Sequence, residues 1–316
     1  LRAAIEEFVG RERPLEDYRD EELGALLLPR LEEEIRPQAV DVILPNIRLV
    51  YAHLAWRYSR GAAVRLAIVD TGILPHRDLR IHGGVSFVPE VRSWRDDNGH
   101  GTHVSGTAAA LLNRQGIVGV APSARLYAVK VLSASGSGRL SQVINGLIWC
   151  YRMRMHVVNL SLGSGFNSHD PRQFNPAYER AGRLLRTRGI LAVAAAGNDS
   201  RRPVNNPARC PSYMAVSAID NRRRFASFSN IGPQVEVCAP GVQVLSTFRH
   251  GYRRLSGTSM ATPHVAGAAA LAKSRYPTLH GDAIRGRIMA TALDLGRPGR
   301  DWFFGHGQVN AYRMAR

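Results

Sequence analysis

Residues 256–267 read SGTSMATPHVAG, and the chain continues with AAALAKSRY to residue 276. This stretch predicts a helix that starts near Ser259 and is nearly apolar on every side, because Ala, Gly and Val dominate it. A helix without a polar face belongs in the interior of a protein. The rest of the fold therefore has to surround it.

Apolar runs alternate along the chain with amphipathic stretches. The runs are continuous, as in parallel strands with both faces covered. They are expected as strands at residues 64–70, 125–132, 156–163 and 190–197, and the helices between them at 101–112, 141–153 and 175–188. Such alternation predicts an α/β fold: a doubly wound, mostly parallel sheet with helices on both faces.

Three polar residues lie in glycine-rich surroundings along this pattern. Asp70 ends the first strand in IVDTG, His100 lies in NGHGTHVSGT, and Ser259 opens the buried helix. A carboxylate, an imidazole and a hydroxyl are the residue set of nucleophilic acyl transfer. Each also has an ordinary structural reading: a turn cap, a packed ring or a helix N-cap. His103, one turn after His100, could share a metal with it, but no third ligand follows at zincin spacing.

In the order Asp, His, Ser, these segments resemble the subtilisin-like serine proteases. The resemblance runs from Leu44 to Ala315 and implies a serine endopeptidase that works through an acyl-enzyme. Asp70 would orient the imidazole, His100 would act as general base and then acid, and Ser259 would be the nucleophile. Asn198, in AAAGND, would join the Ser259 backbone N–H in an oxyanion hole. An Asn after a strand is otherwise an ordinary turn residue.

The same resemblance implies substrate-binding segments. An edge that pairs with the substrate backbone corresponds to Ser161, Leu162 and Gly163. A wall of the pocket for the residue before the scissile bond corresponds to Ala195, Ala196 and Gly197. Asp199 matches a position at the pocket rim, where a carboxylate favours a basic side chain. We therefore expect broad specificity that prefers large apolar residues and tolerates Lys and Arg, with the loop 201–209 helping to form the pocket base.

A structural calcium site is also implied by the resemblance. The carboxylate ligand would be Asp78, and an oxygen-rich loop would supply the other ligands: Leu111, Asn113, Gln115 and Ile117. Oxygen ligands of low total charge suit Ca²⁺ rather than zinc. The alternative is a plain loop that binds no metal.

Residues 1–40 lie outside the resemblance to the protease domain, which we assign to residues 41–316. They predict two short helices in an acidic N-terminal extension. Residues 1–41 hold 12 acidic and 6 basic residues, a net charge of −6, whereas the total of +17 leaves +23 for the remainder. LLLPR echoes the short propeptide of intracellular subtilisins. The extension is thus expected either to dock on the domain, as an inhibitor or propeptide remnant, or to be a solvated tail.

Composition limits the other function classes. The basic excess is almost all arginine and lacks an aromatic-interleaved motif, so nucleic acid is not an expected partner. No apolar run is long enough to span a membrane. Cys150, Cys210 and Cys238 lack metal-ligand spacing and are expected as buried thiols.

The sequence does not assign a cellular compartment. Protein or peptide substrates are expected, and the rival hypothesis is a catalytically silent relative that binds or regulates.

Overall fold

The fold is described from a computed structural model, which covers residues 41–165, 170 and 172–316. The helices predicted within residues 1–40 lie outside the described residues.

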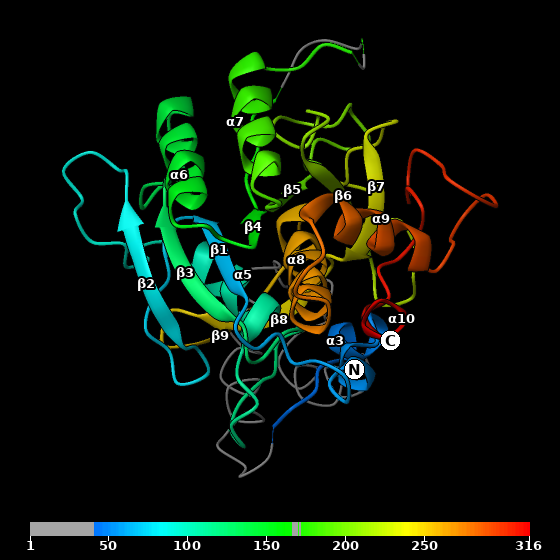
Figure 1. The fold of residues 1–316 in the computed structure, drawn as a ribbon, viewed down its shortest axis with the longest axis horizontal. Helices are drawn as coiled ribbons and strands as arrows, with labels where there is room; N and C mark the ends of the chain where they lie inside the picture. Colours follow the sequence, from blue (N-terminus) through cyan, green and yellow to red (C-terminus); the bar gives the residue numbers. More distant parts are fainter. Residues whose placement is uncertain (1–40, 166–169, 171) are drawn as a thin grey trace, which may run out of the picture.

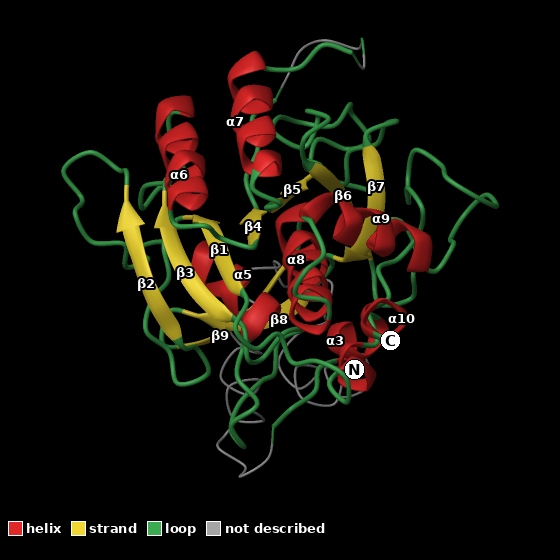
Figure 2. Cartoon of the chain, in the orientation of Figure 1, coloured by secondary structure: helices red, strands yellow, loops and turns green. Residues whose placement is uncertain are grey.

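A seven-stranded sheet forms the centre of the domain (Figures 1 and 2). All its neighbouring strands are parallel. Their order is β2 (Ile81–Ser86), β3 (Arg125–Lys130), β1 (Arg65–Asp70), β4 (Val157–Leu160), β5 (Leu191–Ala195), β6 (Met214–Ile219) and β7 (Val235–Pro240). The predicted parallel α/β class is confirmed, although the sequence analysis had assigned only β1, β3, β4 and β5.

Helices cover both faces of this sheet. Figure 1 shows α6 (Leu140–Arg152) and α7 (Pro176–Thr187) side by side on one face, with α5 (His100–Ala109) and α8 (Thr258–Arg275) on the other. Successive residues of β1 point to opposite faces: Leu66 and Ile68 pack in the core with α5 and α8, and Ala67 and Val69 pack in the core with α6 and α7. This two-sided burial explains the continuous apolar runs.

The buried helix α8 crosses the centre of its face, and its residues from Met260 to Ala272 are all buried. Small residues let α5 approach it closely: a Cβ on Gly267 would lie 2.9 Å from the carbonyl oxygen of Ala108 in α5. The remaining elements surround this core. They are α3 (Pro45–Leu49), α4 (Ala52–Ala55), the antiparallel hairpin β8 (Val244–Phe248) and β9 (Gly251–Leu255), α9 (Gly281–Thr291) and α10 (Ala311–Ala315).

Strand order sets where functional groups gather. Strands β3 and β2 lie on one side of β1, and β4 lies on its other side. The winding of the chain therefore reverses between β1 and β4, and the carboxyl ends of these two strands border that point. Asp70 ends β1, Ser161 follows β4, and Asn198 follows β5 by three residues. Asp70, Ser161 and Asn198 therefore lie at the same edge of the sheet, where the parallel strands end.

Two further expectations concern the chain as a whole. Cys150, Cys210 and Cys238 are free and buried, as predicted. Among the described residues, no helix has both the length and the hydropathy to cross a membrane.

Candidate active site

Asp70 and His100 are in direct contact. His100 Nδ1 lies 2.7 Å from Asp70 Oδ1, which also accepts a hydrogen bond from Thr71 N. Asp70 is fully buried, whereas the His100 side chain is 27% exposed. The contact depends on glycine, because a Cβ on Gly101 would lie 2.1 Å from the carbonyl oxygen of Gly72. The first turn of α5 can therefore rest directly against the end of β1.

Asp96 holds this junction together, a role that the sequence analysis missed. One oxygen of its buried carboxylate accepts from the Thr71 hydroxyl and from the N–H groups of Asn98 and Gly99. The other accepts from the N–H and hydroxyl of Thr102. The turn after β1 and the start of α5 thus share one anchor. The sequence does contain one signal for this role: an acidic residue lies just ahead of a helix N-terminus, where the helix dipole favours a negative charge.

The electrostatics of the two neighbouring histidines differ. Burial lowers the pKa of His100, but the charge and hydrogen bond of Asp70 and the charge of Asp96 outweigh burial, so the pKa is raised. Burial and the nearby His100 lower the pKa of His103 to about 3, although the backbone carbonyls of Val244 and Arg253 oppose this effect. The His103 ring is fully buried, and its Nε2 contacts those two carbonyls. His103 is therefore a neutral packed residue that ties α5 to the β8–β9 hairpin.

Ser259 lies in the first turn of α8, beside the end of β4. Its hydroxyl donates to the Ser161 carbonyl (3.0 Å), and the Ser161 hydroxyl donates to the Ser259 carbonyl (2.7 Å). The Ser259 hydroxyl is held by the Ser161 carbonyl, and the structure has no hydrogen bond between Ser259 and His100. Such contacts are often loose before substrate binds.

Asn198 adjoins the same helix start. Its Oδ1 accepts from the N–H and the hydroxyl of Thr258. These bonds leave Nδ2 as the outward donor. A Cβ on Gly257 would lie 3.4 Å from Asn198 Nδ2 and 3.7 Å from Ser259 N. Two N–H donors therefore converge beside the serine.

Comparison with known proteins identifies the family of this chain. The profile of the subtilase family matches residues 61–307. The chain belongs to the subtilase family. It is 52% identical to the thermostable alkaline protease of Halalkalibacterium halodurans over 88% of this chain and 74% of that protein. It is 49% identical to subtilisin Savinase of Lederbergia lenta over 81% of this chain and 92% of that protein. This subtilase is a serine endopeptidase, as the sequence predicted.

The predicted substrate segments of this subtilase lie around Ser259. Ser161 is buried, Leu162 half-buried and Gly163 exposed, so the chain emerges from β4 toward the surface. Ala195, Ala196 and Gly197 are all buried at the end of β5. Gly197 N donates to the Thr258 hydroxyl, which joins the predicted pocket wall to α8.

Asp199 is exposed and held by two side-chain amides. Its Oδ2 accepts from Asn205 Nδ2 (2.7 Å) and Asn230 Nδ2 (2.8 Å). Asn230 is buried and also donates to the carbonyls of Ala196 and Pro203. The carboxylate therefore has a fixed position, which the sequence alone could not indicate.

The predicted calcium loop of this subtilase lies against a buried carboxylate. Asp78 Oδ2 accepts from the Tyr252 hydroxyl (2.7 Å) and from Ile117 N (3.0 Å). Asp78 Oδ1 is buried and has no hydrogen-bond partner among the described residues. Leu111 N donates to the Asp78 backbone carbonyl, which ties the start of the loop to the same residue. A buried carboxylate oxygen without a donor fits a cation.

The other predicted ligands lie on the same loop. The Asn113 side chain bridges Arg77 O and Gln115 N. Asp41, which the sequence analysis did not place, accepts at Oδ1 from the N–H groups of Asn113 and Arg114. Within the described ranges, no three His, Cys, Asp or Glu side chains cluster as metal ligands. A cation here would therefore depend on few carboxylates and on neutral oxygens, which is a donor set suited to Ca²⁺.

Proposed function

We propose that this endopeptidase cleaves peptide bonds through Asp70, His100 and Ser259. His100 takes the proton of the Ser259 hydroxyl as that oxygen attacks the peptide carbonyl, and then gives the proton to the leaving amine. Water then attacks the acyl-enzyme in the same way, with His100 again as the base, and releases the acyl group. Asp70 holds the ring by the 2.7 Å contact at Nδ1 and stabilises the imidazolium. That contact, between residues 30 positions apart in the chain, is the observation that carries the proposal.

The oxyanion that forms during the attack would be held by two donors. Ser259 N–H is a free donor of the first turn of α8, and Asn198 Nδ2 lies beside it. The bonds from Thr258 to Asn198 Oδ1 fix the amide with its donor side outward. A preorganised pair of donors favours the charged intermediate over the planar substrate.

The specificity that we propose is broad, with large apolar residues preferred before the scissile bond. The small buried side chains of Ala195 and Ala196 support a wide apolar slot. The anchored carboxylate of Asp199 supports tolerance of Lys and Arg. Residues 161–163 would pair with the substrate backbone as an added strand. Comparing cleavage of Phe, Leu, Lys and Glu peptides would test this ranking.

A fluorophosphonate probe tests the catalytic assignment. We expect it to label Ser259 in the folded protein and to fail with Ser259→Ala and His100→Ala. The matched control is Ser164→Ala, an exposed serine near the same site whose backbone alone pairs with Asn206. Labelling that persists in Ser259→Ala would overturn the proposal. A silent relative would show no labelling at all, but the four intact residues and the named proteases among the relatives favour activity.

Calcium would be held by Asp78 with the loop oxygens of Leu111, Asn113, Gln115 and Ile117. Asp41 is a further candidate, because it already caps the loop at Asn113 and Arg114. Bound Ca²⁺ would supply positive charge for the buried Asp78 carboxylate and would fasten the loop to it. The expected role is structural, and no catalytic step uses it.

The acidic extension is proposed to dock on the domain as an inhibitor or folding aid. The support is charge: −6 in residues 1–41 against +23 in the remainder. Deleting residues 1–40 is expected to raise activity or lower the melting temperature. If both stay the same, the extension has neither role.

A further inference from the structure

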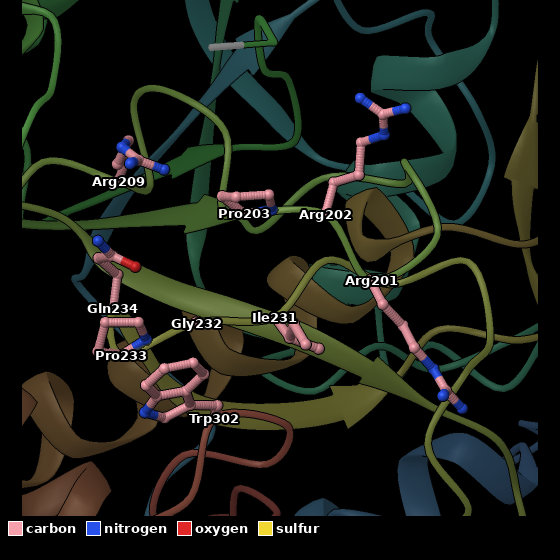
Figure 3. Close-up of a pocket in the computed structure, with 9 residues that line it drawn as sticks. All are labelled: Arg201, Arg202, Pro203, Arg209, Ile231, Gly232, Pro233, Gln234 and Trp302. Atoms are coloured by element: carbon pink, nitrogen blue, oxygen red, sulfur yellow. The ribbon is translucent and has the colours of Figure 1, made fainter. Parts of the chain in front are cut away.

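A pocket of about 360 Å³ lies beside the loop that follows Asn198 (Figure 3). Pro203 and Ile231 lie at its centre, and Trp302 borders one side. Its other lining residues are Arg201, Arg202, Arg209, Gly232, Pro233 and Gln234. The volume falls in the range of ligand-binding pockets. Four of the nine residues lie in the loop 201–209, which is expected to help form the base of the specificity pocket, but none belongs to the proposed catalytic or calcium groups.

The charge of this pocket has one sign. Among the described residues that line it, the charged side chains are all arginines. Arg209 is buried and donates to backbone carbonyls, whereas Arg201 and Arg202 are exposed. In the part of the chain that the structure describes, neither Arg201 nor Arg202 forms an ion pair with a carboxylate; Arg201 lies 6.0 Å from the ring centre of Phe303. Figure 3 shows the Arg201 and Arg202 side chains leaving the loop in different directions, so their two guanidinium groups lie apart.

The apolar part of the pocket is unusually open to solvent. Trp302 is 60% exposed, the largest value among the exposed large apolar side chains of the described residues. Pro233 is also exposed, and its carbonyl accepts from Arg300, a fourth arginine at this surface. An exposed indole and guanidinium groups in the lining of one pocket offer an apolar contact and partners for carboxylates to an extended ligand.

The pocket is joined to the active-site edge through buried Asn230. Its Nδ2 donates to Ala196 O in the predicted pocket wall, to Asp199 Oδ2, and to Pro203 O at the centre of the pocket. Only two residues separate Asn198 from Arg201, a span of roughly 10 Å when extended. A polypeptide held at Ser259 can therefore also reach this surface.

We propose that this pocket is a secondary substrate-binding site for an acidic stretch of polypeptide. An apolar side chain of the substrate packs on Trp302 and Ile231 while neighbouring carboxylates contact Arg201 and Arg202. Ser259 and the proposed substrate segments 161–163 and 195–199 do not line this site, so it selects protein substrates by a segment away from the cleaved bond. The inference rests on the proposed peptide-bond hydrolysis at Ser259.

Matched peptide substrates test the proposal in the full chain. Each has the same cleaved core and carries, on one side or the other, an extension with the sequence Glu-Glu-Phe-Glu-Glu or Gln-Gln-Phe-Gln-Gln. The readout is the ratio, acidic over neutral, of kcat/KM for cleavage of the core bond alone, measured from the core products because the Phe of either extension is itself a cleavage site. The ratio cancels changes in the steps that both substrates share. We expect a ratio of about three to ten for one of the two sides in low salt, as for a few exposed ion pairs, and a ratio near one in 0.5 M salt.

The double variant Arg201→Gln/Arg202→Gln should bring the ratio near one, and Trp302→Gln should weaken both extended substrates. The control Arg125→Gln/Arg152→Gln removes the same charge from exposed positions at the amino-end edge of the sheet and should keep the ratio. A ratio near one in the unaltered protein, or an equal loss in the control, would overturn the proposal.

A binding measurement separates this proposal from the catalytic one. Anisotropy of the fluorescein-labelled acidic peptide is followed with Ser259→Ala, which cannot cleave it. Binding that needs Arg201 and Arg202 supports the pocket even if peptide hydrolysis fails. No difference between the acidic and neutral peptides would reject the pocket while leaving fluorophosphonate labelling of Ser259 unaffected.

Discussion

Ser161 and Ser259 are joined by two reciprocal hydrogen bonds, each from the hydroxyl of one residue to the carbonyl of the other. The pair connects the end of β4 to the first turn of α8. The Ser161 hydroxyl also accepts from the buried amide of Asn159, so it is anchored from the strand side. The residue expected to bind substrate thus also fixes the backbone of the expected nucleophile.

Replacing Ser161 by Ala should therefore affect both stability and rate. The change removes the Ser161 hydroxyl bonds to Ser259 O and Asn159 Nδ2 but keeps the carbonyl that accepts from Ser259. We expect about 1–2 kcal/mol lower stability in urea unfolding, because a buried amide loses its acceptor. We also expect kcat/KM to fall roughly three- to tenfold, because a small displacement of Ser259 from its reactive position slows the attack. Unchanged kinetics would show that the pair does not position Ser259.

Asn198→Asp tests the oxyanion donor with little change in shape. The new side chain keeps an oxygen for the Thr258 N–H and hydroxyl but loses the outward Nδ2 donor. In a subtilisin, loss of this type of donor lowers kcat by about 10²–10³. We expect a loss at least this large, since a carboxylate would also repel the oxyanion, with KM little altered. A variant that keeps more than a tenth of kcat would contradict the assignment.

Gly101→Ala should disrupt the contact between His100 and Asp70. A Cβ at this position would lie 2.1 Å from Gly72 O, which is backbone and cannot rotate away. Overpacking of this kind costs about 1–3 kcal/mol or more, and activity should fall with the shift of α5. Gly286→Ala is the control: nothing lies within 4 Å of its Cβ, and a helix-interior alanine should add about 0.5–1 kcal/mol of stability. Thermal melts and kcat/KM of both variants give the comparison.

The pH dependence should follow the raised pKa of His100. The base must be neutral, so kcat/KM is expected to fall as pH drops through a value above 6.5. Asp96→Asn removes one of the charges that raise this pKa and should move the acid limb to lower pH. The same raised pKa stabilises the folded state below pH 6.5, and this contribution is lost as pH rises through the folded-state value.

Asp282→Asn is the matched control for Asp96→Asn, because Asp282 is exposed and pairs with Arg186 between α7 and α9. This variant should leave the acid limb of the kcat/KM profile at the same pH. An acid limb that stays unmoved in Asp96→Asn would mean that Asp96 acts only as a hydrogen-bond anchor.

Local sequence was enough to single out Asp70, His100 and Ser259 as candidates, whose catalytic roles stay predictions, because each lies in a short motif at the end of a strand or the start of a helix. It could not locate Asp96, whose partners at Thr71 and Thr102 come together only when β1 meets α5. Lys130 was assigned only to a strand, yet its buried ammonium group binds Thr71 O and Asp97 Oδ1. Both are tertiary relationships, and periodicity contains no information about them.

Chelation should reveal whether the loop around Asp78 holds calcium. With Ca²⁺ at about 100 times its Kd, binding adds about 2.7 kcal/mol to the free energy of unfolding. For a domain of this size each kcal/mol corresponds to roughly 2–4 °C, so EGTA should lower Tm by about 5–10 °C. Asp78→Asn should melt at one temperature with and without Ca²⁺, because its buried Oδ1 is the oxygen without a donor. Asp282→Asn should keep the full calcium effect. Equal melting of the unaltered protein in EGTA and in Ca²⁺ would mean that this loop is stable without a metal.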